Sequence, residues 1–146
     1  MGKYPVIFIS LKGVEDFSFD EAQKRLCCLI GNEANRFSFL ENSGRLNERE
    51  KYSYAALVHM EKGIYSMEKS VLVSSLKTLS SLLYKHYGQK VIILIDEYDV
   101  PLDKAFQNGY YDEMVSLIRG LFGEAFKTNQ QPTGQVPGYE RKLYPC

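Results

Sequence analysis

Two short apolar runs stand out along the chain, and amphipathic patterns fill the interval between them. The first run covers residues 4–11, and the second is Val-Ile-Ile-Leu-Ile at residues 91–95. Runs of this length that are rich in β-branched residues predict strands buried on both faces, as in the middle of a parallel sheet. Because helical segments separate the runs, we expect the strands to pair in parallel through a right-handed crossover. The pattern predicts an α/β fold.

Apolar residues recur at helical spacing in four segments. The first predicted helix runs from about residue 19 to residue 37 or 40 and begins with a capping box at Ser18. A weaker helix is expected over 47–63, ended by its glycine, and a stronger one over 66–88, where the first serine is the expected N-cap. The fourth helix is expected over 110–125, after an Asn-Gly turn. Four helices and two strands in 146 residues suit one domain or a piece of one.

Composition narrows the class of protein without deciding its function. The 146 residues contain 18 basic and 18 acidic side chains, so no overall field steers the chain to nucleic acid or to a membrane. Cys27, Cys28 and Cys146 have no metal-ligand spacing and fit a reducing compartment. His59 and His86 lack cysteine partners, and we expect them on helix surfaces. With no signal pattern and no run near the ~18 apolar residues of a membrane span, a cytoplasmic location is expected.

The second apolar run leads directly into Asp96-Glu97-Tyr98-Asp99. Loops at the carboxyl ends of parallel strands are where open α/β sheets bind ligands. A hydrophobic strand followed by Asp-Glu is the Walker B pattern of P-loop NTPases, in which the aspartate helps hold Mg²⁺ and the glutamate polarises the attacking water. The alternative to this functional interpretation is a structural one, in which the acid only caps the turn that follows the strand.

The continuation of this segment resembles a known family. Residues 96–103 read Asp-Glu-Tyr-Asp-Val-Pro-Leu-Asp, similar to the Asp-Glu-Tyr-Asp-x-Pro-Leu signature of the AAA-ATPase-like family of bacterial P-loop proteins, which are often joined to a PD-(D/E)XK nuclease-like domain. The likeness extends from about residue 4 to residue 129 and includes Gly-Tyr-Tyr-Asp-Glu-Met at 109–114.

The resemblance implies a partial P-loop NTPase domain at residues 1–129, an incomplete three-layer αβα sandwich. It implies Mg²⁺ and ATP as cofactors of the complete domain, with Asp96 as the Mg²⁺ ligand and Glu97 as the catalytic residue. We interpret Tyr98, Asp99 and Pro101 as residues that shape the loop.

The Walker A half of such a site is missing from these residues. No G-x-x-x-x-G-K-[ST] motif occurs among the 146 residues. We therefore expect an internal fragment or truncated product of a larger ATPase that does not bind or hydrolyse ATP alone. We also expect its second strand to expose an apolar edge through which the chain self-associates. Residues 130–146 contain three prolines and two glycines without periodicity, which predicts a disordered or foreign tail.

Two other functions stay open. Glu97, Asp99 and Asp103 with Lys104 suggest a metal-dependent nuclease site, although the Asp-Lys spacing is wrong for one. The other alternative is a non-catalytic interaction module or a degenerate remnant, which would pair with a partner strand through its exposed strand edge. Nucleic acid enters as a partner by family analogy alone, and no membrane partner is expected.

Overall fold

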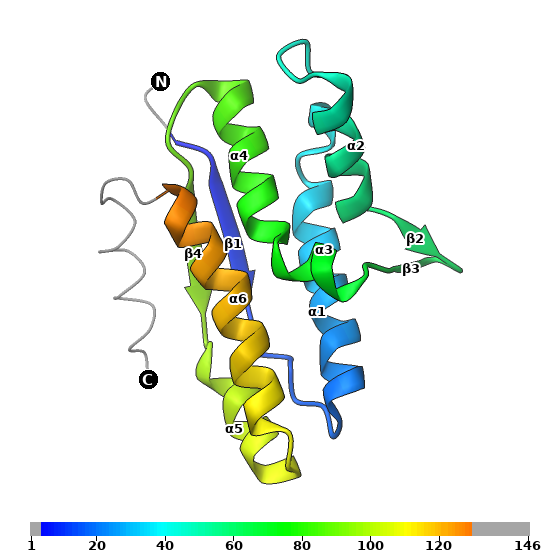
Figure 1. The fold of residues 1–146 in the computed structure, drawn as a ribbon, viewed down its shortest axis with the longest axis vertical. Coiled ribbons are helices and arrows are strands. Elements are labelled where there is room, and N and C mark those ends of the chain that lie inside the picture. Colours follow the sequence, from blue (N-terminus) through cyan, green and yellow to red (C-terminus); the bar gives the residue numbers. More distant parts are fainter. Residues whose placement is uncertain (1–3, 130–146) are drawn as a thin grey trace.

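The computed structural model describes residues 4–129, and the expected tail at 130–146 lies outside the described residues (Figure 1). The elements follow in the order β1 (Val6–Ser10), α1 (Phe19–Asn35), a short 3-10 helix η1 (Ser38–Asn42), α2 (Glu48–Leu57), β2 (Met60–Glu61), β3 (Ile64–Tyr65), α3 (Lys69–Val73), α4 (Ser75–Tyr87), β4 (Ile92–Asp96), α5 (Asp99–Asn108) and α6 (Tyr111–Asn129). The α/β class is therefore confirmed.

The two predicted strands pair side by side and in parallel. Their register runs from Val6 opposite Ile92 to Ser10 opposite Asp96. The ladder extends beyond both strand ends, because Ile92 N–H donates to the carbonyl of Pro5 (2.9 Å) and the amide of residue 11 donates to the carbonyl of Asp96 (2.9 Å). The parallel pairing through a helical crossover is confirmed.

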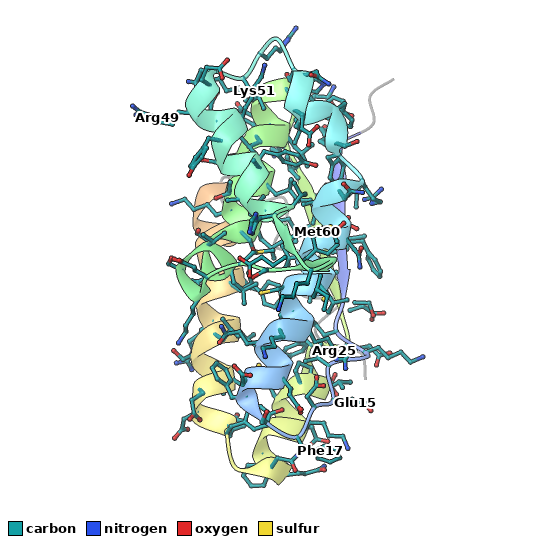
Figure 2. The ribbon with its side chains drawn as sticks, turned by 90° about the vertical axis from the view of Figure 1, so that its right-hand side faces the viewer. Glu15, Phe17, Arg25, Arg49, Lys51 and Met60 are labelled. Atoms are coloured by element: carbon teal, nitrogen blue, oxygen red, sulfur yellow. The ribbon has the colours of Figure 1, made fainter. Side chains whose placement is uncertain are left out.

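The helices lie on one side of this sheet, so only one of its faces is buried (Figures 1 and 2). Ile7, Ile9, Ile93 and Ile95 point into the core and are at most 1% exposed. Phe8 lies between two of them in the strand and is 41% exposed. The prediction of strands buried on both faces is wrong, because residues 4–129 supply two of the three expected layers. The other edge of β4 has no strand partner within residues 4–129, and self-association through that edge stays a prediction.

The segment that was predicted to continue the second helix forms a β-hairpin instead. α2 ends at Leu57, and β2 and β3 pair in antiparallel register. Lys62 and Gly63 take positive φ angles of 56° and 79° between them, the backbone that a tight two-residue hairpin turn requires. Gly63 is therefore a turn residue and not a helix stop.

The helix predicted over residues 66–88 is two helices that meet at Ser74. Its predicted N-cap was wrong, because Ser66 N–H donates to the carbonyl of His59 (2.9 Å) and continues the hairpin, while Glu68 precedes α3. Its predicted end is confirmed, with Gly88 in the left-handed conformation at φ 71°. The first helix is also confirmed, and so is the Ser18 half of its predicted capping box, since Ser18 Oγ accepts from Glu21 N–H at 3.2 Å.

Gly120 allows α6 to pack closely on α3, and Gly123 on the same helix offers a matched control. A Cβ at Gly120 would lie 2.9 Å from Cγ1 of Val73, whereas a Cβ at Gly123 would meet nothing within 4 Å. We expect Gly123→Ala to stabilise the fold by about 1 kcal/mol, the usual helix gain. Gly120→Ala is not expected to show this stabilisation, because its new Cβ would crowd the side chain of Val73, which has few rotamers. Urea unfolding of both variants checks this, and equal stabilities would contradict the close packing.

Tyr54 makes the stability of the fold depend on alkaline pH. Its buried hydroxyl donates to the carbonyl of Ala34 at 2.8 Å, and burial is the main cause that raises its pKa to about 12. In the unfolded chain a tyrosine has a pKa of about 10. Above about pH 10 the unfolded chain releases a proton that the folded chain keeps, so stability falls as the pH rises toward the folded pKa.

Tyr54→Phe tests this dependence. Because the hydrogen bond is lost, the free energy of unfolding of the variant is expected to be about 1 kcal/mol lower at neutral pH. Its stability is also expected to decline less steeply than that of the original chain above about pH 10. Urea unfolding across that pH range measures both effects. Parallel stability curves for the two proteins would contradict a raised pKa at Tyr54.

Candidate functional site

The acidic motif lies at the junction between β4 and α5. Asp96 is the last residue of the strand, and Glu97 follows with a positive φ of 55°. Only a few per cent of residues other than glycine adopt this left-handed conformation, and it costs about 1 kcal/mol or more. The junction is closed by Val100 N–H, which donates to the carbonyl of Glu97 at 3.2 Å. The sharp turn thus holds Glu97 in a fixed backbone geometry directly after the strand.

Ser10 lies beside Asp96, although it was not among the site residues predicted from the sequence. The two residues end neighbouring parallel strands and are opposite each other in the register. Both are partly buried. The signal in the sequence was the position of Ser10 at the end of the first apolar run, because the carboxyl ends of parallel strands meet at one edge of the sheet. A hydroxyl and a carboxylate therefore share this edge.

The loop that follows β1 is held against the same end of the molecule. Arg25 on α1 forms a two-bond ion pair with Asp16, with Nε and Nη2 at 2.9 and 3.0 Å from the carboxylate oxygens. Tyr110 Oη donates to the main-chain carbonyl of Asp16 at 2.7 Å. The pKa of Arg25 is raised by its bonds to Asp16, and burial, followed by the charge of Asp16, raises the pKa of Tyr110. Figure 2 shows Arg25 together with Glu15 and Phe17 near the start of α1.

The residues that were expected to shape a loop begin a helix instead. Tyr98 is the N-cap of α5, and Asp99 and Pro101 lie in its first turn. Proline fits there because the first amides of a helix have no partner within the helix. Pro101 is buried and Asp99 is exposed. The acidic charge of Asp99 suits the positive end of the helix dipole, which supports a structural role for this residue.

A shallow cavity of about 340 Å³ lies next to Tyr98 and contains no carboxylate in its lining. Its walls are mostly apolar and aromatic side chains of α5 and α6, with one guanidinium: Tyr98, Leu102, Tyr111, Val115, Ile118, Arg119, Phe122 and Gly123. Tyr98, which follows Glu97 in the chain, is the lining residue nearest in sequence to the acidic motif.

The three acids of the nuclease hypothesis form no group in the described residues that could hold a metal ion. Asp99 and Asp103 are four residues apart on α5, are both exposed, and line another shallow pocket with Phe106 and Tyr111. Within the described residues, no group of three or more His, Cys, Asp or Glu side chains could hold a metal ion. The geometry thus gives the nuclease hypothesis no support.

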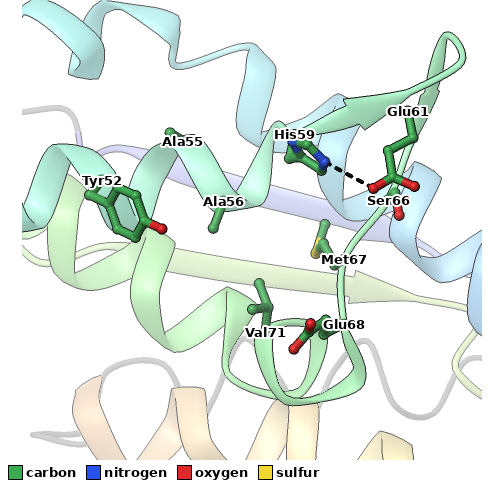
Figure 3. A pocket seen from close by; sticks show the side chains of 9 residues that line it. All are labelled: Tyr52, Ala55, Ala56, His59, Glu61, Ser66, Met67, Glu68 and Val71. Carbon is green, nitrogen blue, oxygen red and sulfur yellow. Dashed lines mark hydrogen bonds and ion pairs between the residues drawn. The ribbon is translucent and has the colours of Figure 1, made fainter.

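A groove of about 390 Å³ lies far from the acidic motif in sequence, between α2, the hairpin and α3 (Figure 3). Figure 3 shows His59 and Glu61 beside it and Glu68 on its other side. The Nε2 atom of His59 lies 3.3 Å from Oε2 of Glu61. Met67 and Val71 supply apolar lining. No local pattern in the sequence indicates this groove, because α2, the hairpin and α3 form it only when they pack together.

The remaining polar candidates have structural surroundings. His86 Nδ1 lies 2.7 Å from Oγ of Ser43 near the end of α4. The buried thiol of Cys27 donates to the carbonyl of Met67 at 3.8 Å, and burial raises its pKa. Cys28 is also a free thiol and is partly exposed. We found no helix in residues 4–129 that is long and apolar enough to cross a bilayer.

Comparison with known proteins adds one match. The family model described as Predicted AAA-ATPase, of the AAA-ATPase-like family, matches residues 1–134. No curated protein matches the chain. No solved structure matches it either.

Proposed function

Because the chain belongs to the AAA-ATPase-like family, we propose that it carries the Walker B part of an ATP-hydrolysing site. Asp96 is the proposed Mg²⁺ ligand, and Glu97 is the proposed residue that orients the attacking water. The observation that carries this proposal is the strained turn at Glu97, which follows the carboxyl end of a parallel strand without a gap. Strained backbone of this kind is concentrated at functional sites.

The side chains at this edge suit magnesium. Mg²⁺ prefers oxygen ligands and in phosphate-transferring sites is held by one or two carboxylates, with phosphates and water completing its coordination. Asp96 supplies such a carboxylate, and Ser10 supplies a hydroxyl on the neighbouring strand. When bound, the ion neutralises charge on the phosphates.

Glu97 has the chemistry of a water-positioning base. Its carboxylate accepts hydrogen bonds from a water molecule and draws a proton from it as the water attacks phosphorus. The adjoining ladder and the first turn of α5 fix the backbone on both sides of Glu97, through the bonds of Asp96 and Val100. Such fixed positioning is the main contribution that a protein makes to phosphoryl transfer.

ATP is the proposed substrate because the chain belongs to the AAA-ATPase-like family. The phosphate-cradling loop and its lysine have no counterpart in the 146 residues, so we expect this chain by itself neither to bind ATP tightly nor to hydrolyse it. We place the reaction in the cytoplasm, where the free thiols of Cys27 and Cys28 stay reduced. Action on nucleic acid rests on family analogy alone.

The proposal is tested first at the encoding locus. A few hundred bases on each side, translated in all frames, are expected to encode a strand with G-x-x-x-x-G-K-[ST] upstream and a further strand downstream. Stop codons on both sides without a P-loop would leave a degenerate remnant. Partner binding would then become the function to test.

Partner binding is the second candidate because β4 pairs with β1 alone within residues 4–129. A strand from a second copy, or from another protein, would extend the sheet at β4 through main-chain bonds. A monodisperse monomer in dilute solution that unfolds cooperatively would count against this candidate.

A further inference from the structure

The outer edge of β1, which faces away from β4, is covered by two charged side chains of α1. Successive residues of a parallel strand direct their main-chain groups to opposite sides. The main-chain groups of Pro5 and Leu11 bond to β4. The main-chain groups of the odd-numbered residues of β1 therefore face β4, while those of Val6 and Phe8 face outward. Figure 1 shows α1 on this outer side of β1.

Both outward groups have a partner on the last turn of α1 or just after it. Glu33 Oε2 accepts from Phe8 N–H at 2.8 Å. Arg36 Nη2 donates to the carbonyl of Val6 at 3.0 Å. One side chain therefore supplies an acceptor and the other a donor, at the places where a neighbouring strand would supply a carbonyl and an amide.

The two side chains hold each other in this position. Arg36 Nη2 lies 2.6 Å from Glu33 Oε2, and Arg36 Nε lies 3.1 Å from Glu33 Oε1. The Glu33 side chain is only 12% exposed, and its bond to Arg36 raises the pKa of the guanidinium. The guanidinium also lies 4.8 Å above the ring of Phe37. Asp20 and Lys24 form the contrasting ion pair on α1, with side chains more than three-quarters exposed.

We propose that Glu33 and Arg36 form an edge guard, which closes β1 to pairing with a strand of a second copy of this chain. An unguarded edge here would offer free main-chain groups next to the exposed ring of Phe8, the combination that promotes pairing between strand edges. With β1 closed, strand addition is confined to β4. The edge guard goes beyond the proposed ATPase function and does not depend on it.

The test compares two double variants of the full chain. Glu33→Ala with Arg36→Ala removes the edge guard, and Asp20→Ala with Lys24→Ala removes an ion pair of the same helix that makes no bond to β1. Loss of the edge guard is expected to increase self-association with concentration in sedimentation velocity. It is also expected to speed hydrogen exchange at the Phe8 amide by roughly tenfold, because a hydrogen bond to a charged group is lost. The control is expected to behave as the unmodified chain in both measurements.

Two outcomes would overturn the proposal. One is a folded double variant that keeps the slow exchange of Phe8 and associates no more than the control. The other outcome needs no folded variant, because two amides of the unmodified chain, those of Phe8 and Ser10, can be compared with each other. Ser10 N–H faces the same edge, and the described residues give it no hydrogen-bond acceptor. The Phe8 amide is expected to exchange roughly tenfold more slowly than the Ser10 amide, and equal rates would contradict the edge guard.

Discussion

Replacing Glu97 by glutamine is expected to reduce ATP turnover by roughly 10²- to 10³-fold in a completed ATPase, in which a Walker A loop has been joined to this chain. Glutamine keeps the size of the side chain and still contacts water, but it does not take up the proton. Because Asp96 and the phosphate-binding groups are unchanged, the affinity for MgATP is expected to stay within a few fold. Steady-state hydrolysis and equilibrium nucleotide binding measure the two effects separately.

Glu97→Gly separates the catalytic role of the carboxylate from a structural one. Glycine adopts the φ of 55° at Glu97 without strain, so this variant is expected to be as stable as the original or more stable by up to about 1 kcal/mol. It is expected to lose turnover like the glutamine variant. Full activity in either variant would reject Glu97 as the base, and unchanged partner binding in both would favour the interaction module.

Truncation of Leu79 is expected to destabilise the fold by about 2 to 5 kcal/mol. Leu79 lies on α4 and is fully buried in the core between the helices and the sheet. Leu79→Ala removes buried apolar surface and leaves a cavity, which neighbouring side chains fill only in part. Since a domain of this size is stable by about 5 to 15 kcal/mol, the loss is a large share of the total.

Ser81→Ala is the matched control on the same helix. Ser81 is exposed, so its replacement is expected to change stability by less than about 0.5 kcal/mol. Urea unfolding followed by circular dichroism gives both values. A loss below about 1 kcal/mol at Leu79 would show that the core rearranges freely around α4, and would contradict its close packing.

Local sequence patterns were sufficient to predict the structure where a residue's environment depends on its neighbours in sequence. The apolar runs predicted β1 and β4, the helical stripe predicted α1, and Gly88 ended α4 as expected. The strand ending in Asp96 and Glu97 was also evident from sequence, because a buried strand and the acids after it are contiguous. Parallel pairing followed from the helices between the strands.

Other features were decided when distant segments met. Ser66 looked like a helix cap, but hairpin pairing with His59 used its amide. Asp99 and Pro101 looked like loop residues, yet the left-handed turn at Glu97 let α5 begin there. Close packing at Gly120 depends on Val73, which lies on another helix.

The sequence by itself determined the class of fold, the two strands and the acidic motif, because hydrophobic periodicity and a contiguous motif are local properties. Only the tertiary structure decided which sheet face is buried, which hydroxyl lies beside Asp96, and how Glu33 and Arg36 close the edge of β1. Those features join residues that are far apart in the chain. Their geometry exists only after α1 and the two strands have packed together.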